Sequence, residues 1–201
     1  PSVPISFRSE LERVADGHGL VTLYLAFKQS PAKLGFRGEN HWIYDGYDHD
    51  ALFKRHGAVL EGRPSGCYLS FQSLKDPEAT AHTAEIIAFL DYASVEQWKN
   101  QPWHKRGEDY DQVKHRVAEG LLDFVDRRYP GFKGLVDYCE VSTPVTVEHF
   151  TGHRRGSVYG IPATPERFRL PYLRVATPIR NLYLTGADVA SLGIMGAMMG
   201  G

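Results

Sequence analysis

The sequence has few cysteines: Cys67 and Cys139 are the only two among 201 residues, and each stands alone in a strand-like run. Two isolated cysteines exclude a disulfide framework and a CxxC metal or redox motif, so a reducing compartment fits the chain. No stretch reaches the roughly 18 consecutive apolar residues of a membrane-spanning helix. Pro1-Ser2-Val3-Pro4 also lacks the basic region and apolar run that open a signal peptide. We therefore expect a cytoplasmic globular protein.

An excess of charge of either sign is also missing, because the formal net charge is -1. Hydrophobic residues make up 42% of the chain and charged residues 23%, which is typical of a globular domain with a real core. Residues 151–201 carry six arginines and no lysine. Arginine supplies planar paired donors, so this segment suggests phosphate or carboxylate contacts and not a diffuse nucleic-acid surface. We expect no nucleic-acid partner.

Several runs rich in β-branched, aromatic and aliphatic residues predict strands, over 20–27, 66–73 and 83–92. Residues 136–150 alternate again but are interrupted by Pro144, which predicts an edge strand or two strands separated by a bend. The runs are expected to pair in one mixed, largely antiparallel sheet.

The clearest helix is predicted over 109–129, where apolar residues recur on one face and Pro130-Gly131 follows. Ser94-Val95-Glu96-Gln97 fits a capping box and predicts a short helix that carries Trp98. The fold class is therefore α+β, with helices on one face of the sheet.

Glycines and prolines punctuate the chain after His149, and a short strand predicted from Ile179 leads into Gly186-Ala187-Asp188 and a helix that starts at Gly193. Glycines at such a turn let a ligand approach the backbone closely. Pattern alone also allows a second interpretation, in which a strand simply packs tightly on a helix of small residues.

The chain carries these motifs in combination: Gly156-x-x-Tyr159-Gly160, Arg167-Phe168, Thr177-Pro178-Ile179-x-Asn181-Leu182-Tyr183-Leu184-Thr185-Gly186-x-Asp188 and Gly193-Ile194-x-Gly196-Ala197. The combination resembles the C-terminal part of the phytoene desaturase, carotenoid isomerase and all-trans-retinol saturase family of FAD-dependent oxidoreductases. The resemblance covers most of the chain and is strongest over residues 156–201.

By this resemblance, residues 1–160 are a substrate-binding domain and residues 161–201 are the C-terminal strand and helix of a Rossmann-like FAD domain. The family's Gly-x-Gly-x-x-Gly unit, which holds the FAD pyrophosphate, is absent, and Gly17-His18-Gly19 lacks its third glycine. The sequence therefore resembles a fragment that is inactive alone and does not retain FAD. The implied parent is an oxidoreductase acting on C–C bonds of an apolar isoprenoid or polyene, by desaturation, saturation or isomerisation. A non-catalytic binding or interaction module derived from the same fold is the alternative.

The resemblance also implies site residues, all on the cofactor side. Gly186 would allow close approach, Asp188 would accept hydrogen bonds from FAD ribityl or phosphate-linked groups, and Gly193, Ile194 and Met195 would lie against the isoalloxazine. A carboxylate that caps the following helix is the alternative for Asp188. Tyr159 is a candidate for flanking the flavin or substrate, or else a buried sheet tyrosine. No catalytic side chain is identified, because the chemistry would be the cofactor's.

The expected partners are a lipophilic small molecule and the missing N-terminal FAD domain, with a homodimer of the fragment as a further option. Trp98 and Trp103, near basic residues, suggest peripheral membrane contact, or else a short helix whose indoles dock on the sheet. His149 and His153 are four apart, but the strand-like residues before them argue against a helix, so no metal site is expected.

The sheet face opposite the helix over 109–129 is expected to expose side chains such as Tyr24, Tyr68 or Phe71. In an intact enzyme of the family this face would line an apolar tunnel. We therefore expect an apolar patch of at least a few hundred Å² there.

Overall fold

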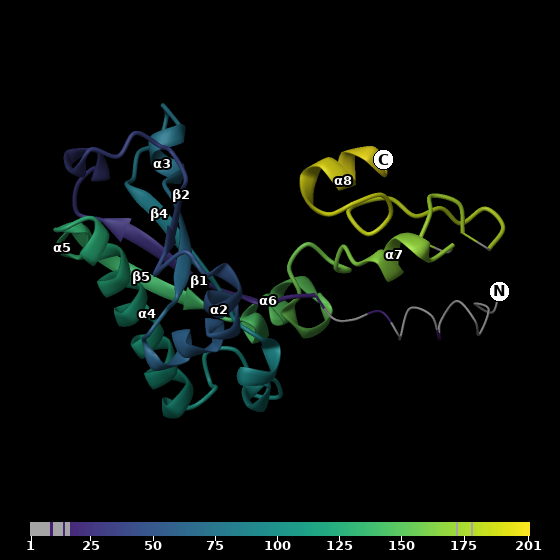
Figure 1. Cartoon of the computed structure of the whole chain (residues 1–201), viewed down its shortest axis with the longest axis horizontal. Coiled ribbons are helices and arrows are strands. Elements are labelled where there is room, and N and C mark those ends of the chain that lie inside the picture. The colour runs from purple at the N-terminus through teal and green to yellow at the C-terminus, as the bar shows by residue number, and fades with distance from the viewer. Residues whose placement is uncertain (1–8, 10–13, 15–16, 172, 178) are drawn as a thin grey trace.

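A computed structural model of the chain describes residues 9, 14, 17–171, 173–177 and 179–201, so the opening Pro1-Ser2-Val3-Pro4 lies outside the described residues. They form a five-stranded sheet in the order β2-β3-β4-β1-β5, in which every neighbouring pair is antiparallel (Figure 1). The strands are β1 (Leu20–Phe27), β2 (His41–Tyr44), β3 (Gly66–Ser70), β4 (Thr83–Phe89) and β5 (Val136–Ser142). The α+β prediction is confirmed.

Helices connect and cover these strands. The α-helices are α2 (His49–Lys54), α3 (Gln72–Lys75), α4 (Glu108–Arg128), α5 (Phe132–Leu135), α6 (Pro144–Thr151), α7 (Pro165–Arg169) and α8 (Gly193–Met199). Short 3₁₀ helices are η1 (Pro31–Leu34), η2 (His56–Glu61), η3 (Tyr92–Ser94), η4 (Glu96–Trp98) and η5 (Arg154–Gly156). None of the helices in the described ranges combines the length and the apolar character needed to cross a membrane.

The core lies between the sheet and α4. Alternation along β1 buries Val21, Leu23 and Leu25, while α4 buries Val117 and Leu121 in the same cluster. Acidic residues fill the first turn of α4 and arginines its last turn, which complements the helix dipole. Because α4 covers one face, the opposite face of the sheet remains free to form a site.

The segment after β5 differs from the sequence prediction. Residues 136–142 form β5, but Pro144 begins α6 and not a second strand. Proline is well suited to the first turn of a helix, where its missing N–H removes a donor that has no partner in any case. His149 consequently lies in a helix, contrary to the expectation for that residue. The described residues contain no cluster of three or more His, Cys, Asp or Glu side chains suited to a metal ion.

The predicted capping box at Ser94 is also wrong. Residues 92–98 form η3 and η4, and neither has a side-chain cap. The Trp98 indole is 4% exposed and donates a 2.8 Å hydrogen bond to Asp109 Oδ2. Trp98 therefore belongs to the core and is not available to a membrane surface.

The C-terminal segment, residues 157–201, extends away from the sheet beyond α6 (Figure 1). The strand predicted from Ile179 does not form: Ala176 and Tyr183 make a single β-bridge. Asn181 has a φ of +64°, a left-handed conformation that reverses the chain and interrupts extended structure. The predicted helix after Gly193 is present as α8.

Candidate functional site

A row of side chains crosses the sheet face that α4 leaves free. Trp42 pairs with Tyr68, Tyr68 pairs with Ile87, and Ile87 pairs with Thr22, so these residues from four strands share one face. The Trp42 and Tyr68 ring centroids lie 4.9 Å apart. The residues that alternate with them along β1, β3 and β4 point into the core. The sheet thus presents a largely aromatic and aliphatic surface at Trp42, Tyr68 and Ile87.

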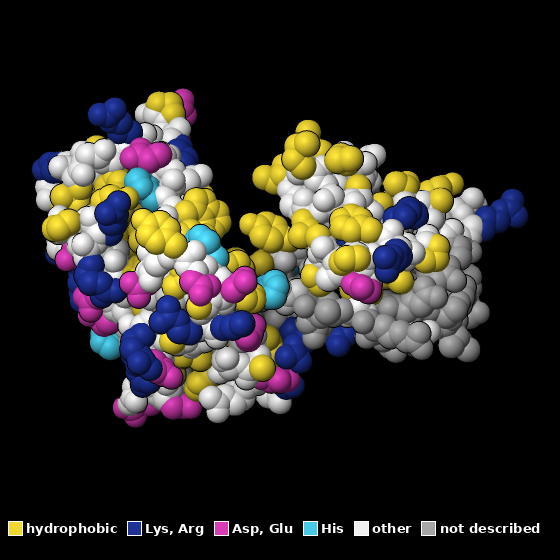
Figure 2. All heavy atoms as spheres, in the orientation of Figure 1, with side chains coloured by type: hydrophobic (Ala, Val, Ile, Leu, Met, Phe, Trp, Pro, Cys, Tyr) yellow, Lys and Arg dark blue, Asp and Glu magenta, His cyan; other side chains and the backbone are white. Residues whose placement is uncertain are grey.

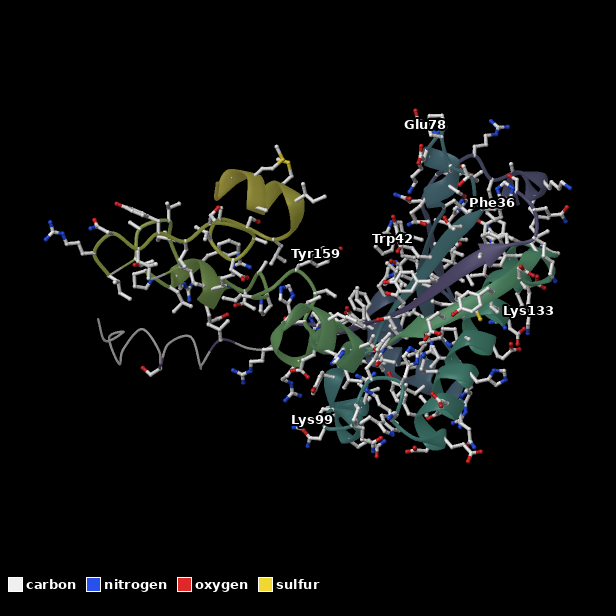
Figure 3. All side chains as sticks on the ribbon, turned by 180° about the vertical axis from the view of Figure 1, so that it is seen from behind. Phe36, Trp42, Glu78, Lys99, Lys133 and Tyr159 are labelled. Carbon is white, nitrogen blue, oxygen red and sulfur yellow. The ribbon has the colours of Figure 1, made fainter. Side chains whose placement is uncertain are left out.

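This surface is one wall of a cleft with a volume of about 1100 Å³. The opposite wall comes from the C-terminal segment, at Val158, Tyr159 and Leu192, and α2 contributes Leu52 and Phe53 to the lining. Figure 2 shows hydrophobic side chains on both flanks of the hollow between the sheet and the C-terminal segment. Figure 3 shows Trp42 and Tyr159 on its facing sides. The cleft is large enough for a small organic ligand.

The expected exposed tyrosines are found, with one correction. Tyr24 is 49% exposed and Tyr68 is half-buried in the cleft wall. Phe71, which was named with them, is completely buried. The reason is that Phe71 continues the alternation of the buried residues Cys67 and Leu69, opposite to Tyr68, and packs in the core on Phe36, with ring centroids 4.3 Å apart.

The ionisable side chains of the cleft differ in whether they have hydrogen-bond partners. His56 Nε2 lies 2.9 Å from Asp91 Oδ2, and its Nδ1 contacts the Phe53 carbonyl, so both ring nitrogens have partners. The His18 ring meets Phe53 edge-on at 5.6 Å. Within the described residues, the Glu85 carboxylate has no hydrogen bond or ion pair. Glu85 on the sheet, like the exposed Asp50 on α2, therefore keeps free acceptor capacity in a cleft whose lining is largely apolar.

Cys67 lines the same cleft but is no nucleophile at neutral pH. Its strand position directs it toward the core, and burial raises the pKa of its thiol to about 12. Desolvation penalises the charged thiolate, so the group stays protonated. Burial likewise raises the pKa of the Cys139 thiol.

The residues suggested for cofactor contact cluster in the C-terminal segment. Asp188 Oδ1 accepts a 2.7 Å hydrogen bond from the Ile161 N–H. Arg167 is 2% exposed, and its guanidinium donates to the carbonyls of Ile161 and Ala187. These bonds tie the start and the end of the segment together. The suggestion that Asp188 caps α8 is wrong, because Leu192 precedes that helix and no side chain caps it.

The other residues suggested for cofactor contact expose either their backbone or an apolar side chain. Gly186 has a φ of +103°, and a Cβ built there would meet nothing within 4 Å. Gly193 is also left-handed, with a φ of +68°. Ile194 and Met195 are 81% and 69% exposed. A bound group would therefore reach both the backbone at Gly186 and these apolar side chains.

Tyr159 is the one suggested residue that the structure places on the cleft itself. It is 62% exposed with a φ of +64°, so the alternative of a buried sheet tyrosine is wrong. Gly186, Asp188 and Gly193–Met195 are not among the lining residues, although Leu192 directly before them is.

Sequence reasoning missed the β2 side of the cleft. Strand β2 has only four residues, and Trp42 and Tyr44 on it are both exposed toward the cleft. The alternation of His41-Trp42-Ile43-Tyr44 was the available signal. Glu85 was also missed, because a single acid inside an apolar strand has no sequence motif.

Comparison with known proteins gives several matches. The all-trans-retinol 13,14-reductase of Danio rerio is 29% identical over 97% of this chain and 34% of its own length. An inactive all-trans-retinol 13,14-reductase of the same organism is 28% identical over 95% of this chain and 33% of its own length. The chloroplastic prolycopene isomerase of Arabidopsis thaliana is 23% identical over 63% of this chain and 21% of its own length. No protein-family model matches the chain.

The chain thus spans about one third of the length of the retinol reductases that it matches. The matches to these proteins cover nearly the whole chain, including both walls of the cleft. By these matches, the chain is similar to proteins of the retinol saturase and carotenoid isomerase family.

Proposed function

We propose that this chain is the substrate-binding part of an oxidoreductase that acts on C–C bonds of an apolar polyene or isoprenoid. The observation that carries the proposal is the cleft of about 1100 Å³ between the aromatic sheet face and the C-terminal segment. Apolar walls gain free energy from covering an apolar ligand, at roughly 25 cal/mol per Å² of buried surface. The names of the relatives point to the same ligands, since one is a reductase of all-trans-retinol and another an isomerase of prolycopene.

We propose that residues 1–160 are the substrate-binding domain and that residues 161–201 complete an FAD domain supplied by the rest of the protein. The residues of the C-terminal segment fit such a group. Gly186 leaves open space beside its backbone, Asp188 keeps Oδ2 for a ligand, and Ile194 and Met195 are exposed. FAD, when bound, supplies the electron transfer.

The chain's own contribution is then to bind and orient the substrate. The Trp42, Tyr68 and Ile87 row supports one side of an elongated apolar molecule. Tyr159 and Leu192 belong to the opposite wall and connect directly to the segment that would contact the cofactor. Covering the substrate on two sides excludes water from its double bonds.

A non-catalytic binding module of the same fold is the second candidate. It is favoured by a specific observation, namely that one of the matching relatives is named as inactive. Both candidates require the cleft to bind an apolar ligand, and they differ only in whether electron transfer follows.

Binding is tested with all-trans-retinol, whose fluorescence rises when it enters an apolar site, titrated into the 201-residue chain. Tyr68→Ala removes an aromatic ring from the cleft wall and should weaken binding about 10-fold or more. Tyr138→Ala is the matched control, since Tyr138 lies on the same sheet face, is 61% exposed and is outside the cleft lining. Equal losses in both variants, or no binding by the parent chain, would contradict the proposal.

A further inference from the structure

Glu85 places a carboxylate on the sheet wall of the cleft. It lies on β4 two residues before Ile87, and its backbone pairs with Tyr24 on one side and Ser70 on the other. Its side chain is half-buried and lines the cleft. The cleft lining also includes polar side chains, among them Asn40, Asp50 and His56, but Glu85 is the carboxylate on the sheet wall itself, beside Tyr68 and Ile87.

No cation in the described part of the chain neutralises Glu85. Lys75 contacts Ser70, the residue that pairs with Glu85, at 2.6 Å from its Oγ, and Asn40 Oδ1 at 2.5 Å. Lys75 forms no ion pair with Glu85. Glu140 makes the contrast clear, because that carboxylate, on β5 of the same face, contacts Lys114 and Tyr138. Glu85 therefore keeps its acceptor capacity for a bound molecule.

An apolar ligand that covers Glu85 removes water from the carboxylate, which costs free energy unless the ligand supplies a donor. A hydroxyl group supplies one. An ester of the same molecule supplies none, and a carboxylate adds like-charge repulsion. The chemistry of the site thus ranks the three head groups in the order alcohol, ester, carboxylate.

We propose that Glu85 accepts a hydrogen bond from the hydroxyl group of an otherwise apolar substrate and so selects alcohols over their esters and acids. This inference rests on the proposed function, because it assigns the head-group specificity of the same cleft. Glu85 acts here as a specificity residue and not as a proton donor in the reaction.

The test compares three probes with one carbon skeleton, all-trans-retinol, retinyl acetate and retinoate, by equilibrium titration of the 201-residue chain at neutral pH. The parent chain should bind retinol roughly 10-fold more tightly than retinyl acetate, the usual effect of a hydrogen bond to a charged group. Glu85→Val removes the acceptor and should make those two affinities equal. Glu85→Gln removes the charge and should tighten retinoate binding about 10-fold.

Glu140→Gln is the matched control and should leave the order of the three affinities unchanged. Equal affinities of the parent chain for all three probes would overturn this inference alone and leave the proposed function standing. An alcohol preference that survives Glu85→Val, or that Glu140→Gln abolishes, would also overturn it. Failure of the parent chain to bind any probe would overturn the proposed function and the inference together. Thermal unfolding of each variant shows that a change in binding is not a loss of fold.

Discussion

Asp188 Oδ1 accepts a 2.7 Å hydrogen bond from the backbone N–H of Ile161, which joins two parts of the chain that are 27 positions apart. The bond fixes the cleft wall at residues 158–164 to the segment proposed to contact a cofactor. One residue, Asp188, thereby connects the cleft wall with the segment proposed to contact a cofactor, while its second oxygen stays available.

Gly160 is required for this contact. A Cβ at position 160 would lie 2.2 Å from Asp188 Oδ1, and the φ of +76° disfavours any other residue. We expect Gly160→Ala to break the bond and to speed hydrogen exchange of the Ile161 amide by roughly 10-fold or more. Gly152→Ala is the control, because Gly152 has a φ of +70° but open space around it. An unchanged Ile161 exchange rate in Gly160→Ala would contradict the account.

Arg167 is predicted to hold the C-terminal segment together. Its buried guanidinium donates to the carbonyls of Ile161 and Ala187, and removal would leave those acceptors without their partner at a cost of about 1–3 kcal/mol. Arg167→Met should make residues 157–192 more sensitive to limited proteolysis while the sheet stays intact. Arg169→Met, an exposed change on the same helix, should have no such effect. Equal sensitivity of both variants would argue against this role.

Cys67 should make stability depend on alkaline pH. Its pKa in the folded chain is about 12 against an ordinary value of 9.0, so the unfolded chain loses the proton first. The protonated Cys67 thiol contributes to the free energy of unfolding. This contribution is fully present below pH 9 and is lost as the pH rises toward 12, on the order of 2–4 kcal/mol in total. Urea unfolding between pH 8 and 11 measures this slope. The slope should be shallower in Cys67→Ala; identical slopes would show that Cys67 is not the cause.

The 201-residue chain is predicted to purify colourless. The sequence has no Gly-x-Gly-x-x-Gly unit, which would hold the FAD pyrophosphate, and the contacts proposed for Gly186, Asp188 and α8 would not replace it. Absorbance of the purified chain near 450 nm, an approximate value set by the flavin itself, is the measurement. Stoichiometric yellow flavin would show that the fragment interpretation is wrong.

The sequence predicted those parts of the fold that depend on long periodic patterns. Strand β1 and helix α4 agree with their predicted ranges to within a residue, because each buries a regular apolar face. The prediction of strand structure over 136–150 is wrong from Pro144 onward, because β-branched residues favour a strand locally, whereas Pro144 favours the first turn of a helix.

The candidate site was only partly predictable. Tyr159 was found through its motif, and the structure places it on the cleft. Trp42 and Glu85 come together only through the pairing of β2, β3 and β4, and that pairing depends on contacts far apart in sequence. No local sequence pattern in the chain predicts which strands pair with one another.

The most direct test of the account follows the three tryptophan indole N–H signals in a ¹⁵N–¹H spectrum as all-trans-retinol is added. Trp42 lies in the cleft, Trp98 is buried against Asp109, and Trp103 is exposed outside the cleft. We expect the Trp42 signal to shift or broaden with saturation while the other two signals stay in place. A saturable shift of Trp103 with Trp42 unchanged, or no shift of any indole, would contradict a polyene-binding cleft on this face of the sheet.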